Sequence, residues 1–259
     1  MKQSKTLTNI LILLCGIVAL WLVISHIAHF EYPDYFWRAN PDIKTYVGIN
    51  VVSFWADFSF FTYITMILFG IWCITLSIAK FFNLEKLKDF LSQDWLVCFI
   101  FINYLFTAVL YTIFQIPNGD FGLYSTTKPL AWHNLGTSIL GHYILFICSV
   151  IIFIKLKSNE QISIKNKKIG HITSSVFLLI YYLVVKLLGE FAYQIRWFPY
   201  VIFDAKSFGT MLGIQNYAVS VIMLVVCCLV LFVIYQLTFS IMLKYKQKQR
   251  IKQKTTQIV

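Results

Sequence analysis

Long apolar runs, separated by shorter polar segments, dominate the sequence. Because an α-helix rises about 1.5 Å per residue, about 20 apolar residues cross the hydrocarbon core of a bilayer. Six runs are of about this length or longer. We therefore predict an all-α polytopic membrane protein, a bundle of six transmembrane helices. The predicted spans are Leu7–His29, Val51–Ala79, Trp95–Ile116, Leu130–Ile154, His171–Leu188 and Asn216–Leu243.

The composition agrees with membrane insertion. Hydrophobic residues make up 59% of the chain and charged residues 13%, whereas about a quarter of the residues of a typical soluble domain are charged. The six cysteines all lie inside apolar runs and show no CxxC or metal-ligand spacing. We therefore expect them to be core residues rather than disulfides or metal ligands.

Lysine and arginine residues are distributed unevenly between the two sides of the predicted bundle. Of the 22, 16 lie in the N-terminus, the second and fourth loops and the C-terminal segment. The positive-inside rule places these segments, and so both termini, in the cytoplasm. We expect a single transmembrane domain over residues 1–243 and a basic cytoplasmic tail over residues 244–259. This charge bias suits a bacterial plasma membrane.

The net charge of +11 raises the question of nucleic-acid binding. The basic residues follow the membrane topology, however, and the tail sequence KYKQKQRIKQK comes directly after an apolar span. Such segments contact anionic lipid headgroups. We predict membrane lipids as partners, with anionic headgroups at the basic inner face, and no nucleic acid.

Two polar side chains are expected at the same depth in the membrane. Thr62 lies about 11 residues into the second span and His142 about 12 residues from the outer end of the fourth, so they lie about 16 and 18 Å below the outer surface. Asn134 and Ser138 precede His142 at four-residue spacing and share its helical face. Ionisable groups at this depth are costly and are candidates for function. The depth does not determine whether the two spans lie side by side.

The Thr62–His142 pair has two interpretations. A threonine hydroxyl becomes a useful nucleophile when a neutral imidazole removes its proton, so the pair could attack an ester carbonyl and form an acyl-enzyme. Alternatively, the threonine bonds back to a carbonyl one turn earlier and the histidine joins two helices. Asp57 could orient His142 or gate a polar substrate, or it could be an interfacial carboxylate. Asn103 in the third span is expected to bond to a neighbouring helix.

Motifs of several other functions are missing from the sequence. It contains no Walker loop, no GxGxxG, no HExxH and no GxSxG elbow. Haem ligation would need two histidines at matching depth, and His142 has no histidine partner at its level. His26, His29 and His133 on the outer side are interface residues or, alternatively, ligands of a metal cluster. We predict an enzyme or binding protein with no cofactor and no metal.

Three segments together resemble a known family. SFFTYITMILFG at 59–70 is similar to a "YFTxxSN" segment, SILGHYILF at 138–146 to "NxxxHYxxP", and IRWFPYVIFD at 195–204 to "WYPYPFLD". These segments occur in this order in a bacterial integral-membrane family related to the androgen-induced and androgen-dependent intramembrane hydrolases. The sequence departs from the family pattern at Met66, Ser138, Phe146 and Val201.

The resemblance implies an activity and a site. Relatives hydrolyse fatty acid esters of hydroxy fatty acids with a threonine nucleophile and a histidine base, which correspond to Thr62 and His142 here. We expect an intramembrane lipid-ester hydrolase acting on fatty-acyl esters. The alternative is a non-catalytic membrane protein of the same fold that binds lipid, acts as a scaffold or transports a solute. The residues expected to bind substrate or stabilise an oxyanion are Ser138, Asn134, Tyr143, Trp197, Pro199, Tyr200, Asp204 and Asp57.

Overall fold

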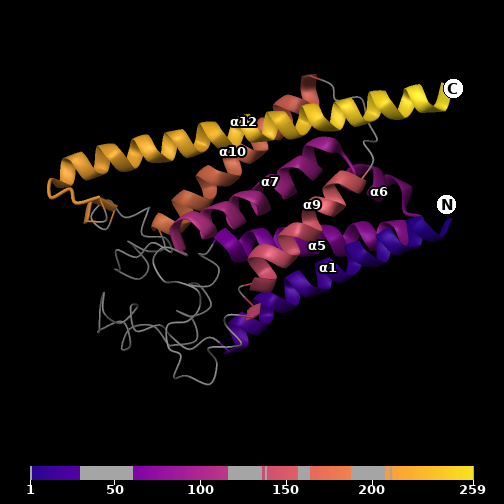
Figure 1. The fold of residues 1–259 in the computed structure, drawn as a ribbon, viewed down its shortest axis with the longest axis horizontal. Helices are drawn as coiled ribbons and strands as arrows, with labels where there is room; N and C mark the ends of the chain where they lie inside the picture. The colour runs from indigo at the N-terminus through magenta and orange to yellow at the C-terminus, as the bar shows by residue number, and fades with distance from the viewer. Residues whose placement is uncertain are drawn as a thin grey trace.

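The structure is a computed structural model that describes residues 2–29, 61–115, 136–137, 139–156, 164–187, 208–210 and 212–258. Over these ranges the chain forms helices and short turns and no strand, which confirms the all-α prediction for this part of the protein. The elements are α1 (Lys2–His29), α5 (Phe61–Phe81), α6 (Glu85–Leu91), α7 (Asp94–Leu110), η1 (Tyr111–Gln115), η2 (Leu140–Ile144), α9 (Leu145–Lys155), α10 (Ile164–Leu187) and α12 (Tyr217–Ile258) (Figure 1).

Within the described ranges, four segments are long and apolar enough to cross a membrane, which indicates an integral membrane protein. They correspond to the first, second, third and sixth predicted spans. The fifth predicted span lies in α10, which begins at Ile164 rather than His171. In the region of the fourth, the described apolar helix Leu140–Lys155 is shorter than a span. The four candidate spans are Thr6–Ser25, Phe61–Phe81, Asp94–Ile113 and Tyr217–Ile251.

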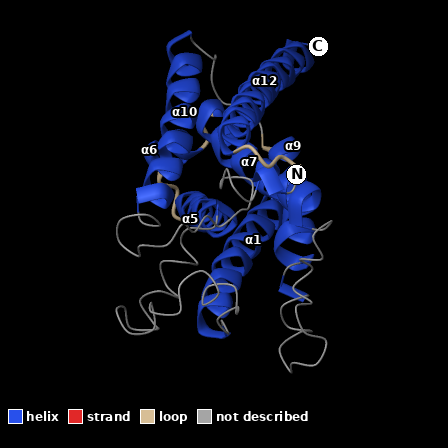
Figure 2. Cartoon of the chain, turned by 90° about the vertical axis from the view of Figure 1, so that its left-hand side faces the viewer, coloured by secondary structure: helices blue, strands red, loops and turns tan. Residues whose placement is uncertain are grey.

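The helices form an elongated bundle around α7. Helices α5, α9, α10 and α12 all contact α7, and α1 packs along α5 and reaches α9. Two views show α10 and α12 on one side of α7 and α1 on the other (Figures 1 and 2). The start of α1 and the end of α12 lie at the same end of the bundle (Figure 1).

An aromatic cluster joins α5 to α7. The ring of Phe69, which is fully buried, stacks on that of Tyr104 with 5.0 Å between centroids and meets that of Phe101 edge-on at 5.8 Å. Trp72 also meets Phe101 edge-on, and its indole N–H donates to the carbonyl of Leu91 at 3.0 Å. Because edge-on and offset contacts between aromatic rings are favourable beyond the area they bury, this cluster fixes α5 against α7.

Helices α1 and α5 cross closely at two glycines. A Cβ atom added at Gly16 would lie 2.8 Å from Cβ of Cys73 and 2.9 Å from the carbonyl oxygen of Gly70. A Cβ atom added at Gly70 would lie 2.8 Å from side-chain atoms of Leu20. Small residues allow helix backbones in membranes to approach to this distance, so the crossing depends on both glycines.

Helix α12 continues without a break through the predicted boundary at residue 243, so the described part of the basic tail is helical. Lys246 in this part is 1% exposed. Its ammonium group donates to the carbonyls of Phe153 (2.5 Å) and Leu156 (2.7 Å), and the amide of Gln249 donates to the carbonyl of Ile154 at 3.0 Å. Since a helix leaves its last carbonyls unsatisfied and favours a cation there, α12 caps the C-terminal end of α9.

Candidate functional site

His142 lies in the π-helical turn η2, where the N–H of Leu145 bonds to the carbonyl of Leu140, five residues earlier. Its side chain is 8% exposed, and its Nδ1 atom is buried and has no hydrogen-bond partner among the described residues. Buried polar atoms without partners are rare in proteins and call for an explanation, such as a catalytic role. Single π-helical turns inside α-helices are also frequent at functional sites. His142 therefore combines two features of a functional residue.

Tyr111 supports the imidazole ring of His142 from a second π-helical turn. Tyr111 is the first residue of η1, and its ring is nearly parallel to that of His142, with 3.6 Å between centroids and an angle of 7°. The ring of Tyr143, next to His142, meets Tyr111 edge-on at 6.3 Å. The two π-helical turns thus face each other, and the imidazole of His142 stacks on the ring of Tyr111.

Two hydroxyl groups attach η2 to α7 and η1. The hydroxyl of Tyr104 donates to the carbonyl of Gly141 at 2.6 Å. The hydroxyls of Tyr143 and Thr112 lie 3.2 Å apart. Because Thr112 donates its only hydroxyl proton to the carbonyl of Ala108 at 2.8 Å, Tyr143 is the donor to Thr112. Tyr143, a predicted oxyanion donor, thus uses its proton within the protein in this structure.

Thr62 lies in the first turn of α5 and is 6% exposed. Met66 is one turn further along the same face of α5. A Cβ atom added at Gly141 would lie 2.5 Å from Cε of Met66, so this face of α5 touches the backbone beside His142. The depth match inferred from sequence is therefore accompanied by a lateral contact between the two elements. The hydroxyl of Thr62 does not bond to Nδ1 of His142 in this structure, since that atom bonds to none of the residues described.

Thr65, the second threonine of α5, belongs to a network that joins three helices. Its hydroxyl donates to the carbonyl of Thr62 and lies 2.9 Å from the hydroxyl of Thr107 on α7. Asn103, one turn from Thr107, accepts a hydrogen bond from the hydroxyl of Tyr235 on α12 at 3.1 Å. The prediction that Asn103 bonds to a neighbouring helix is confirmed. Polar pairs of this kind stabilise helix association in membranes, which gives Thr65 a structural role.

Most of the predicted substrate-binding residues lie outside the part of the chain that the structure describes. These are Asp57, Asn134, Ser138, Trp197, Pro199, Tyr200 and Asp204.

All six cysteines lie in the described ranges. All six cysteines are free thiols, as expected. Among the described residues no group of three or more His, Cys, Asp or Glu could hold a metal ion.

A second polar cluster, which the sequence did not indicate, lies between α10 and α12 and contains His171, Gln236 and Ser240. The four-residue spacing of Gln236 and Ser240 places them on one helical face, and this spacing is the only sequence signal that could have singled them out. Thr62, His142, Tyr111 and Tyr104 form the candidate site described first.

Comparison of the chain with models of known protein families, with curated proteins and with solved structures found no match.

Proposed function

We propose that the protein is an intramembrane hydrolase of fatty-acyl esters that uses Thr62 as nucleophile and His142 as base. The observation that supports this most strongly is Nδ1 of His142, a buried nitrogen on a π-helical turn that has no partner in the described part of the chain. An imidazole that only joined two helices would be expected to use its buried nitrogens in hydrogen bonds. A nitrogen left unpaired is available to a substrate or to a nucleophile that moves towards it.

The proposed reaction is acyl transfer in two steps. The proton of the Thr62 hydroxyl passes to His142 as the hydroxyl oxygen attacks the ester carbonyl. The leaving alcohol takes this proton, and water then hydrolyses the acyl-threonine with His142 again as base. Tyr111 and Tyr104 are positioning residues in this proposal, because one stacks on the imidazole and the other fixes the turn that carries it.

The membrane arrangement belongs to the same proposal. We propose six crossings, with α10 and the segment containing η2 and α9 added to the four apolar helices, and both termini in the cytoplasm of a bacterial plasma membrane. The common end of α1 and α12 in the bundle supports an even number of crossings (Figure 1). Lipids would be the partners, with acyl esters as substrates and anionic headgroups at the basic inner face.

Labelling with a fluorophosphonate probe tests the nucleophile. We expect the purified full-length protein in phosphatidylcholine vesicles to be labelled on the peptide that contains Thr62, and Thr62→Val to abolish this label. Because a general base contributes about 10²–10⁴-fold, His142→Gln should slow labelling, and the hydrolysis of a fatty acid ester of a hydroxy fatty acid, by at least about 10²-fold.

Thr65→Val is the matched control, since it also replaces a buried α5 threonine by an isosteric residue. It removes the contact with Thr107 and should lower stability without abolishing the label at Thr62. A folded, ester-hydrolysing wild type without label on the peptide that contains Thr62, or equal labelling of that peptide in the wild type and His142→Gln, would refute the proposal. A folded wild type without label or ester turnover would favour the non-catalytic alternative, in which the polar network of Thr65, Thr107, Asn103 and Tyr235 simply holds the bundle together.

A further inference from the structure

The polar cluster between α10 and α12 has the geometry of a hydrolytic triad. The Nδ1 atom of His171 lies 2.6 Å from Oε1 of Gln236. The Nε2 atom of the same imidazole lies 3.3 Å from the hydroxyl of Ser240, one turn further along α12. A hydroxyl, an imidazole and a third group that orients the imidazole are the three parts of a serine hydrolase site.

The hydrogen bonds around Gln236 fix the orientation of its amide. Its Nε2 atom donates to the hydroxyls of Ser174 (3.3 Å) and Ser175 (3.0 Å). Both serines donate their own protons to the carbonyl of His171, so they can only accept from the amide. The amide oxygen of Gln236 therefore faces His171.

This orientation determines the tautomer of His171. Because Oε1 of Gln236 can only accept, Nδ1 of His171 carries the proton, and Nε2 is the unprotonated nitrogen. The nitrogen that can act as a base therefore faces the hydroxyl of Ser240. In this structure that hydroxyl also lies within hydrogen-bond distance of the carbonyl of Gln236, at 3.0 Å, so turning the proton from this carbonyl to Nε2 suffices to form the nucleophile–base bond.

A close backbone approach keeps the three groups together. A Cβ atom added at Gly170 would lie 2.7 Å from the ring of Phe239. The ring of His171 meets the same Phe239 ring edge-on at 4.9 Å. The absence of a side chain at Gly170 thus lets α10 approach α12 beside Ser240, and the packed ring limits rotation of the imidazole.

We propose that Ser240, His171 and Gln236 form a second hydrolytic site, which cleaves acyl esters of anionic lipids at the cytoplasmic surface of the membrane. The proposal uses the cytoplasmic placement of the end of α12 given above, but not the chemistry of Thr62 and His142. A neutral amide also fills the third position in Cys–His–Asn proteases, so Gln236 is chemically suited to orient the base.

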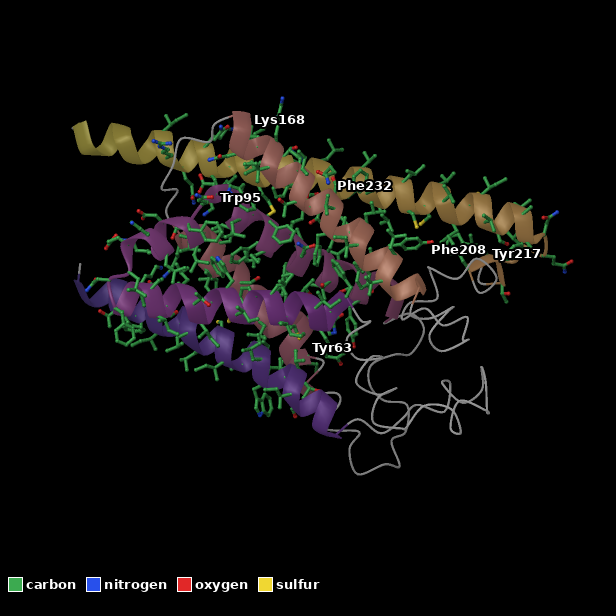
Figure 3. All side chains as sticks on the ribbon, turned by 180° about the vertical axis from the view of Figure 1, so that it is seen from behind. Tyr63, Trp95, Lys168, Phe208, Tyr217 and Phe232 are labelled. Carbon is green, nitrogen blue, oxygen red and sulfur yellow. The ribbon has the colours of Figure 1, made fainter. Side chains whose placement is uncertain are left out.

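The side chains around this site match an anionic lipid. Ser240, His171 and Gln236 are half-buried, and the exposed apolar side chains of Ile172 and Ile241 follow two of them directly. Lys244 lies one turn beyond Ser240, and Lys168 one turn before His171; both are exposed. Figure 3 shows Lys168 projecting from α10 away from the other helices. Apolar side chains would contact an acyl chain, and the two ammonium groups an anionic headgroup.

The reaction balances with water as the only co-reactant. Nε2 of His171 takes the proton of the Ser240 hydroxyl, and the serine oxygen forms a bond to the carbonyl carbon of the ester. The bond from this carbon to the alcohol oxygen breaks, and His171 gives its proton to that oxygen. Water then attacks the acyl-serine, with its proton passing through His171 to the oxygen of Ser240, which releases a fatty acid.

The test uses full-length protein in vesicles of phosphatidylglycerol or of phosphatidylcholine, with fluorophosphonate labelling and mass-spectrometric identification of the labelled peptide. We expect the label on Ser240 and a greater release of fatty acid from phosphatidylglycerol. Ser240→Ala should abolish both. Thr238→Ala is the matched control, because Thr238 is a half-buried α12 hydroxyl that donates to the carbonyl of Ile234 and contacts no base in the described structure.

Changes at Gln236 separate an orienting role from a merely structural one. Gln236→Glu keeps an acceptor for Nδ1 of His171 and should retain labelling of Ser240, whereas Gln236→Leu should slow it by about 10²-fold or more. If Gln236 only forms a polar contact between helices, both variants should change the melting temperature and Ser240 of the wild type should not be labelled. That result would overturn the proposal. Labelling on Ser240 but not Thr62 would support this site and refute the Thr62–His142 proposal, and the reverse pattern would do the opposite.

Discussion

Replacing Tyr104 by Phe removes one hydroxyl from the core and leaves the rest of the side chain in place. Tyr104 is 1% exposed, and its hydroxyl donates to the carbonyl of Gly141 at 2.6 Å. The aromatic ring, and with it the stacking on Phe69, is kept in the variant. The change therefore isolates a single hydrogen bond between α7 and the π-helical turn that carries His142.

The expected cost follows from the burial of this bond. Removing one partner of a buried hydrogen bond costs about 1–3 kcal/mol, because the other partner loses its donor where water cannot replace it. Because Tyr104 is 1% exposed, Tyr104→Phe should cost about 1–3 kcal/mol. Since the lost bond holds the turn beside His142, we also expect slower labelling of Thr62 by the probe.

Unfolding in mixed detergent micelles, followed by tryptophan fluorescence, measures the free-energy change. Tyr143→Phe is the control, because it removes a hydroxyl from the same region whose bond to Thr112 is solvent- or lipid-exposed and 3.2 Å long; it should cost at most about 0.5 kcal/mol. If Tyr104→Phe unfolds like the wild type, or if Tyr143→Phe costs more than Tyr104→Phe, then the bond to Gly141 does not hold the turn as we infer.

Three further predictions concern a helix crossing, a helix cap and a hydrogen bond between helices. Gly16→Ala should cost about 1–3 kcal/mol through overpacking at the α1–α5 crossing. Gly136→Ala, where an added Cβ meets no described atom within 4 Å, should be neutral in the same unfolding assay; equal effects would show that the crossing tolerates a side chain. Lys246→Met should cost about 1–3 kcal/mol by leaving the carbonyls of Phe153 and Leu156 without their donor, whereas Lys244→Met, at an exposed position, should change stability by less than about 0.5 kcal/mol. Tyr235→Phe should cost about 1–3 kcal/mol because Asn103 loses its donor, and the double variant Tyr235→Phe with Asn103→Leu should be more stable than the sum of the single changes indicates.

Hydropathy predicted features that depend on one helix alone. The apolar runs identified the four described helices that are long and apolar enough to cross a membrane, whereas the membrane depths of Thr62 and His142 stay predictions from their distances along the chain. Because a buried amide needs a hydrogen-bond partner, Asn103 is expected to bond to a neighbouring helix. Its hydrogen bond with Tyr235 confirms this. Each of these inferences uses only the sequence of one helix and the apolar environment that surrounds it.

Contacts between helices could not be predicted in the same way. The stacking of Tyr111 on His142, the Gly16–Gly70 crossing and the His171–Gln236–Ser240 cluster depend on the rotation and lateral position of helices distant in sequence. Helical periodicity gives the face of each residue but not the helix that this face meets. Lys246 is a clear example, since a lysine in a run of basic residues is normally expected at the surface and is here buried against α9.

The capping of α9 by Lys246 has a consequence for biosynthesis. The two residues of the Lys246–Phe153 bond are separated by 93 positions, so a ribosome that adds about 5–20 residues per second needs about 5–20 s to make the cap after α9 itself. During this interval the last carbonyls of α9 can be satisfied only by water or lipid headgroups. The C-terminal end of α9 therefore reaches its final state late, after α10 and most of α12 have been synthesised.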